Sequence, residues 1–167
     1  MIFSEQWLRE WVSPEFETQQ LIDELTMAGL EVDGSMPVAC QCSGIVVGLV
    51  ESIEPHPDAD KLSLCSVSDG EESFQVVCGA PNVRAGIKVP FAKLGATIIE
   101  STGAKPFKIK KAKIRGVESN GMLCSSEELG LEESSDGLLE LHENADVGEN
   151  IRSSLKLDDT SIELDLT

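Results

Sequence analysis

Between residues 43 and 141, glycine- and proline-containing turns divide the chain into short apolar segments rich in β-branched residues. The segment 45–53 and the alternating residues 62–67 are typical of strands, and Asp69-Gly70 indicates a turn. Further strands are predicted at 74–78, 87–92, 107–117 and 138–141. Several short strands with frequent glycines over roughly 100 residues favour a small closed barrel.

The first 39 residues follow a helical period instead. Ser4 is a suitable N-cap for a short helix whose apolar face includes Trp7 and Trp11. A second helix is predicted to follow and to end at Gly29, which can adopt the left-handed C-cap conformation. We interpret the two tryptophans as core residues of this small segment.

The C-terminal residues 149–167 change pattern again. A polar helix is predicted near 151–157, and residues 161–166 alternate cleanly between polar and apolar. An alternating strand needs a partner strand and a covered face. We therefore interpret the end at Thr167 as a boundary within a longer protein, which leaves a small α+β domain truncated at its C-terminus.

Composition excludes several classes of protein. No run of 18 apolar residues is present, so no membrane span is predicted, and the N-terminus lacks the basic start of a signal peptide. The five cysteines are odd in number and lack the spacing of zinc ligands. These features predict reduced thiols and a cytoplasmic protein.

The net charge of −17 should repel nucleic acid unless the basic residues are concentrated. Between residues 105 and 115 there are six basic residues and no acidic ones. They are Lys105, Lys108, Lys110, Lys111, Lys113 and Arg115. Because alternate side chains of a strand share a face, three or four of them could line a groove for phosphates. The alternative is a solvated face that protects an edge strand from aggregation.

No catalytic constellation is predicted. The chain lacks a P-loop, a G-x-S-x-G motif and an H-E-x-x-H motif. His56 alternates with Asp58 and Asp60, a spacing that could resemble a metal cluster. However, prolines flank the histidine and Lys61 follows the acids, so we interpret this segment as a structured turn. We predict no metal site and no catalytic residue.

Aromatic residues are scarce in the predicted barrel. The chain has no tyrosine, and only Phe74, Phe91 and Phe107 fall within the barrel segment. Single-stranded nucleic acid is usually bound by stacking bases on aromatic rings. The composition therefore favours recognition of the shape and phosphates of folded RNA.

Several segments in order identify a family. They are His56-Pro-Asp-Ala-Asp-Lys-Leu62, Val77-Cys-Gly-Ala-Pro-Asn-Val-Arg84, Lys88-Val-Pro90, Phe107-Lys-Ile-Lys-Lys-Ala-Lys-Ile-Arg-Gly-Val117, Ser119-Asn-Gly-Met122 and Glu127-Glu-Leu129. Together they resemble the tRNA-binding domain family, over about residues 40–148. That family is an OB-fold found on phenylalanyl-tRNA synthetase beta subunits, on some methionyl-tRNA synthetases and as free tRNA-binding proteins.

The flanking segments narrow the resemblance. Residues 3–9, 25–32 and 162–167 look like the start of the bacterial phenylalanyl-tRNA synthetase beta-subunit family. The resemblance implies an α+β, mainly β protein in which an OB-fold barrel, residues 40–148, is inserted into a small α+β domain. Residues 1–39 and 149–167 would form that domain.

The resemblance also implies a function. The family's complete enzyme joins phenylalanine to tRNA(Phe) with ATP and Mg²⁺, as an alpha2-beta2 tetramer with its aminoacylation site on the alpha subunit. No cofactor is expected within the present chain. Carried over by position, the expected tRNA-binding residues are Lys61, Asn82, Arg84, Lys105, Lys108, Lys110, Lys111, Lys113 and Arg115.

Two other functions remain open from sequence alone. Residues 40–148 hold 10 basic and 17 acidic residues, and the flanks hold 3 and 13, so even the predicted barrel is acidic overall. This balance is compatible with an assembly module of the same subunit that binds RNA weakly. A free-standing tRNA-binding protein is the other alternative.

Overall fold

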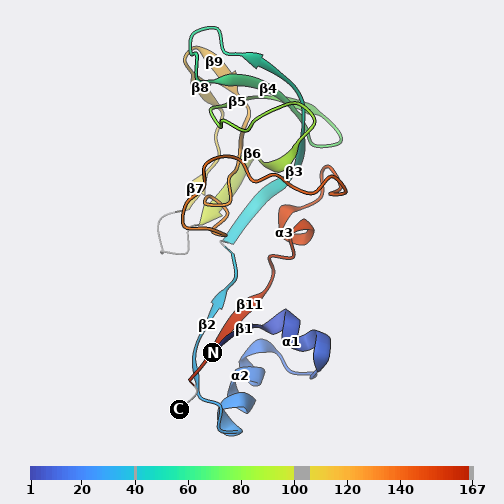
Figure 1. The fold of residues 1–167 in the computed structure, drawn as a ribbon, viewed down its shortest axis with the longest axis vertical. Helices are drawn as coiled ribbons and strands as arrows, with labels where there is room; N and C mark the ends of the chain where they lie inside the picture. The colour runs from blue at the N-terminus through green and yellow to red at the C-terminus, as the bar shows by residue number, and fades with distance from the viewer. Residues whose placement is uncertain (40, 100–105, 166–167) are drawn as a thin grey trace. The chain divides into compact units, whose positions relative to one another are not determined.

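The computed structural model describes residues 1–39, 41–99 and 106–165 (Figure 1). It is mainly β, as predicted. The chain divides into two compact units: Met1–Ala39 with Lys156–Thr167, and Cys40–Leu155. None of the described helices has the length and hydropathy needed to cross a membrane.

The first unit is a three-stranded antiparallel sheet with two helices. Its elements are β1 (Ile2–Ser4), α1 (Glu5–Trp11), α2 (Thr18–Met27), β2 (Val32–Pro37) and β11 (Thr160–Leu164). The sheet order is β1-β11-β2. Ser4 caps α1 by accepting a hydrogen bond from Trp7 N at 3.0 Å, and Gly29 follows α2 with a φ of 92°, so both predicted helix ends are confirmed. The small core of this unit contains Leu21 and Ile162.

The interpretation of the tryptophans as core residues is wrong. Trp7 is 57% exposed and Trp11 is 75% exposed. Their rings contact each other edge to face, with 6.5 Å between centroids. A helix of seven residues has only a narrow stripe to bury, and in α1 Leu8 packs against the core in their place.

The second unit contains a six-stranded antiparallel sheet. Its strands are β3 (Gln41–Pro55), β4 (Ser63–Ser68), β5 (Ser73–Cys78), β6 (Lys88–Ile99), β7 (Phe107–Lys108) and β10 (Gly121–Leu123). The order is β10-β6-β3-β4-β5, and β7 pairs with β6. A separate two-stranded sheet is formed by β8 (Ala112–Ile114) and β9 (Val117–Ser119), and α3 (Ile151–Ser154) follows near the end of the unit. The strand predicted at 138–141 is absent, because those residues form isolated hydrogen bonds and no ladder.

The sheet of the second unit packs tightly where β3, β4 and β6 meet. Phe91 is fully buried at this point. A Cβ atom on Gly48 would lie 2.6 Å from Phe91 Cβ and 2.9 Å from Val67 Cγ1. Only glycine allows β3 to approach the phenylalanine this closely. This packing fixes the scaffold from which the basic residues project.

Candidate nucleic-acid interface

A tight hairpin carries two of the expected tRNA-binding residues, Lys113 and Arg115. We call residues 112–119 the basic hairpin. Ile114 pairs with Val117, so only Arg115 and Gly116 connect its strands. Both connecting residues have a positive φ, 47° and 87° respectively, as a type I′ hairpin turn requires.

The backbone at Arg115 is unusual for its residue type. The first central position of such a turn is normally Asn, Asp or Gly, because other side chains disfavour a positive φ. An arginine at this position costs on the order of 1 kcal/mol. Arg115 therefore places an exposed cation at the hairpin tip, and its strained backbone lowers the stability of the turn. Strain of this kind is common at functional sites.

Side-chain and backbone hydrogen bonds fasten β9 to β5. Gln75 Nε2 donates to the carbonyl oxygen of Glu118 at 2.7 Å, and the amide of Asn120 donates to the carbonyl oxygen of Gln75 at 2.8 Å. The amide of Val77 donates to Ser119 Oγ at 3.1 Å. Figure 1 shows β8 and β9 beside β5 at one end of the second unit. The basic hairpin is thus held against the sheet along one strand.

A buried histidine fastens the other strand. His56 is 5% exposed, and its Nε2 lies 3.1 Å from the carbonyl oxygen of Ile114. Its Nδ1 accepts a hydrogen bond from the amide of Asp58 at 3.1 Å, which leaves the proton on Nε2 to donate to Ile114. The amide of His56 also donates to the carbonyl oxygen of Leu62 at 3.0 Å. The interpretation of this segment as a structured turn is confirmed, and we call residues 56–62 the histidine loop.

The rest of the basic segment does not form one continuous strand, so the prediction of a strand at 107–117 is wrong. Ile109 is buried, and its backbone bonds to β6 at both ends: to Ala96 O and from Gly95 N, each at 2.8 Å. Lys110 and Lys111 then leave the ladder before β8 begins. The basic side chains consequently do not share a single strand face. All those from residue 108 to 115 are nevertheless exposed.

One carboxylate partly neutralises this cluster. Lys111 Nζ lies 2.8 Å from Glu118 Oε2, and Glu118 is the cross-strand partner of Lys113. The ammonium of Lys111, with a smaller contribution from Lys113, holds the pKa of Glu118 below its ordinary value. Both members of the ion pair are about half exposed, so salt will screen it.

Asn82 and Arg84 make contacts elsewhere in the unit. The side-chain amide of Asn82 accepts from Leu138 N and donates to Leu138 O, both at 2.9 Å. Arg84 forms a two-pronged ion pair with Glu140, at 2.7 and 2.8 Å, and it holds the pKa of that carboxyl below its ordinary value. Within the described part of the chain, no hydrogen bond or ion pair joins either residue to the basic hairpin.

The remaining expected lysines are Lys61 and Lys105. Lys61 is exposed on the histidine loop, which is bonded to the basic hairpin through His56. Lys105 lies outside the described residues.

Sequence reasoning missed three residues that build the site: Gln75, Glu118 and His56 in its role as a hairpin anchor. The Arg115-Gly116 step was an available signal, because a two-residue turn there would have placed Glu118 opposite Lys113. No local pattern marks Gln75 or the long-range bond of His56, since both depend on which strands become neighbours.

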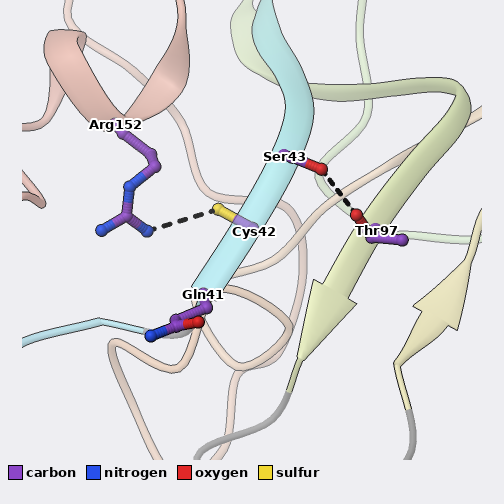
Figure 2. A pocket seen from close by; sticks show the side chains of 5 residues that line it. All are labelled: Gln41, Cys42, Ser43, Thr97 and Arg152. Carbon is purple, nitrogen blue, oxygen red and sulfur yellow. Dashed lines mark hydrogen bonds between the residues drawn. The ribbon is translucent and has the colours of Figure 1, made fainter.

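A separate cavity of about 370 Å³ lies at the start of β3 (Figure 2). It is lined by Gln41, Cys42, Ser43, Thr97 and Arg152. Figure 2 shows the arginine directed toward the thiol, with 3.9 Å between Nη1 and Sγ. The hydroxyls of Ser43 and Thr97 hydrogen bond to each other at 2.5 Å. None of the expected tRNA-binding residues lines this cavity, and no metal-binding cluster occurs among the described residues.

Comparison with known proteins gives a consistent result. The model of the tRNA binding domain family matches residues 45–150. The whole chain is 64% identical to part of the phenylalanine–tRNA ligase beta subunit of Hahella chejuensis and 62% identical to that of Pseudomonas fluorescens. It spans 20% of the length of each of these relatives.

Among solved structures, a methionyl-tRNA-synthetase-related protein from Pyrococcus horikoshii is similar at 26% identity, with a TM-score of 0.45. The similarity covers 66% of this chain and 87% of that protein.

Proposed function

Because this chain belongs to the tRNA binding domain family, we propose that it is the tRNA-binding region of the beta subunit of a phenylalanine–tRNA ligase. The identity of 64% extends over all 167 residues, beyond the family match at 45–150, and supports this choice over a free-standing tRNA-binding protein. Such a subunit works in the cytoplasm with an alpha subunit, in an alpha2-beta2 enzyme that uses ATP and Mg²⁺ to join phenylalanine to tRNA(Phe). The reaction itself takes place outside the present chain.

The proposal includes a fold and a domain arrangement. In this proposal the antiparallel sheet of the second unit is an OB-fold, residues 40–148, inserted into a small domain formed by residues 1–39 and 149–167. The predicted C-terminal boundary differs from that of the compact units, because residues 149–155, which include α3, belong to the second unit. The pairing of β11 with both β1 and β2 supports this arrangement, because it joins the two ends of the chain in one sheet.

The observation that carries the proposed function is the basic hairpin with its strained arginine. Lys113 and Arg115 project from a short element that is fastened on both strands, so the backbone that carries these cations is positioned before any ligand arrives. A preorganised cation loses less conformational entropy when it meets a phosphate. Lys108, Lys110 and Lys111 extend the exposed positive surface toward β7.

The overall charge sets the conditions for binding. The acidic remainder of the chain repels RNA at long range, whereas the basic hairpin attracts phosphate at short range. Salt screens the repulsion, but it also weakens the phosphate contacts that release counterions. Affinity should therefore be modest and should fall steeply with salt.

Titration of the 167-residue chain with tRNA at several salt concentrations tests the proposal. Replacing Lys110, Lys111 and Lys113 with alanine should weaken binding with little dependence on RNA sequence. It should flatten the log–log salt slope by roughly two units, at about 0.7 per phosphate contact. Lys156→Ala, which removes an exposed cation from the first unit, is the control and should leave the slope unchanged.

Two results would count against the proposal. Unchanged binding in the triple variant would remove these lysines from the interface. No binding by the unaltered chain even at low salt would favour the alternative function, an assembly module of the same subunit. The net charge of −7 in residues 40–148 is the observation behind that alternative.

A further inference from the structure

We propose that His56 is a positioning residue for tRNA binding, which locks the histidine loop to the basic hairpin so that Lys61 and Arg115 contribute to one phosphate-binding surface. This inference rests on the proposed function of the hairpin. His56 is not itself an RNA contact, because its ring is buried and both of its nitrogens already have protein partners.

The two ring nitrogens of His56 make different hydrogen bonds. Nδ1 accepts from the amide of Asp58, two residues along, and so shapes the loop locally. Nε2 donates to the carbonyl oxygen of Ile114, which is 58 residues away in sequence. The ring of His56 therefore links two segments that are far apart in the sequence.

The hydrogen bond from His56 to Ile114 lies next to the turn of the basic hairpin. Ile114 is the last residue of β8 and immediately precedes the strained turn at Arg115 and Gly116. Backbone strain at Arg115 favours fraying of the hairpin. The hydrogen bond at the neighbouring Ile114 opposes this fraying. Without that bond, β8 would be held by its short ladder with β9 and by its connection to β7.

The chain has one other histidine, His142, which can be compared with His56. His142 forms the same local bond, with its Nδ1 accepting from the amide of Asn144 at 3.1 Å. Unlike His56, it is exposed, and no described hydrogen bond connects it to the hairpin. Because the two histidines share the local turn, burial and the long-range bond to Ile114 are the features that distinguish His56.

Two substitutions separate the functions of the nitrogens. Asparagine can replace Nδ1 as an acceptor but is too short to reach Ile114, whereas the amide nitrogen of glutamine reaches about as far as Nε2 and can donate there. The positioning role predicts that His56→Gln retains tRNA binding and that His56→Asn weakens it roughly tenfold, with a salt slope flattened by about one to two units. His142→Asn is the matched control and should bind like the unaltered chain.

Amide hydrogen exchange provides a readout that is independent of RNA. In His56→Asn, exchange should accelerate at residues 112–119, while the buried strands β3 and β4 stay protected. His56→Gln should preserve protection in both places. Equal hairpin exchange in the Asn and Gln variants would overturn the positioning role even if both variants fold.

The tRNA titration distinguishes failure of this inference from failure of the proposed function. If the unaltered chain binds tRNA and the Asn and Gln variants bind equally well, the positioning role is overturned and the proposed function stands. If the unaltered chain does not bind tRNA at low salt, the proposed function fails and this inference fails with it.

Discussion

Arg115 places a charge where the backbone would favour a different residue, so stability and binding should respond in opposite directions to its replacement. Asparagine tolerates the positive φ of 47° and is a preferred residue at this turn position. We expect Arg115→Asn to raise the free energy of unfolding by about 0.5–1 kcal/mol. The same variant should weaken tRNA binding and flatten the salt slope by about 0.7–0.9 units.

Urea unfolding and tRNA titration of one Arg115→Asn sample measure both effects. Lys156→Asn removes an exposed cation from the first unit at a residue that also has a positive φ, 53°, and controls for the loss of net charge in the titration. A variant that is less stable than the unaltered chain, or that binds tRNA equally well, would contradict the interpretation of the strained turn.

Gly48 is required by packing and not by backbone conformation. An added Cβ would overlap both Phe91 and Val67, which are fully buried and would have to shift within the core. We expect Gly48→Ala to lower the free energy of unfolding by about 1–3 kcal/mol, the usual cost of overpacking a core. Gly34→Ala in β2, where a Cβ would meet nothing within 4 Å, is the control for thermal unfolding. Equal midpoints in the two variants would show that the sheet tolerates the extra methyl group.

Asp69 should make the second unit sensitive to acid. The ammonium of Lys93 at 2.5 Å, together with the amides of Glu72 and Glu71, lowers the pKa of the buried Asp69 carboxyl from 3.8 to about 2. A depressed pKa in the folded state means that the stabilisation is present above pH 4 and is lost as the pH falls from about 4 to 2. Because Lys93 is partly exposed, we expect a contribution of only about 1–2 kcal/mol.

Urea unfolding of Asp69→Asn at a series of pH values tests this prediction. The difference from the unaltered chain should be largest at neutral pH and should approach zero near pH 2. Glu118→Gln, which alters an exposed pair, should show little change over the same range. A difference for Asp69→Asn that stays constant with pH would show that the ion pair is not responsible.

At the scale of single elements, α1 offers a direct optical test. Both tryptophans of the chain lie in this helix, and there is no tyrosine, so the indole emission reports on α1 alone. Given exposures of 57% and 75%, acrylamide should quench the folded chain almost as strongly as the chain in urea. Strong protection in the folded state would place the tryptophans in a core, as the sequence pattern had suggested.

The same elements show what could be predicted from sequence. The apolar strands at 45–53 and 74–78 were predictable because β-branched composition and turn residues are local signals. The segment 107–117 was predicted as one strand, whereas Ile109 keeps its backbone bonds to β6 and the two lysines after it do not. This break depends on pairing with a distant strand, which no local pattern marks. The exposure of Trp11 could not be foreseen, since burial depends on which face of a short helix meets its neighbours.

At the scale of the whole molecule, composition alone would argue against an RNA-binding function. The net charge of −17 is opposed only by a local cluster, and the structure shows that most of this cluster is exposed on or next to the basic hairpin. The positions of the cations along the chain were predictable. Their arrangement in space, including the separation of Asn82 and Arg84 by their own hydrogen bonds, required the tertiary fold.

We propose that the basic hairpin and the histidine loop together form the tRNA-contacting surface. Backbone NMR spectra of the isotope-labelled chain, recorded with and without tRNA at low salt, would locate this surface residue by residue. We predict that the perturbed amides cluster in residues 56–62 and 108–119, and that those of α1 and α2 remain unchanged. Perturbations confined to other parts of the chain, or absent altogether, would show that tRNA does not bind at the basic hairpin and the histidine loop.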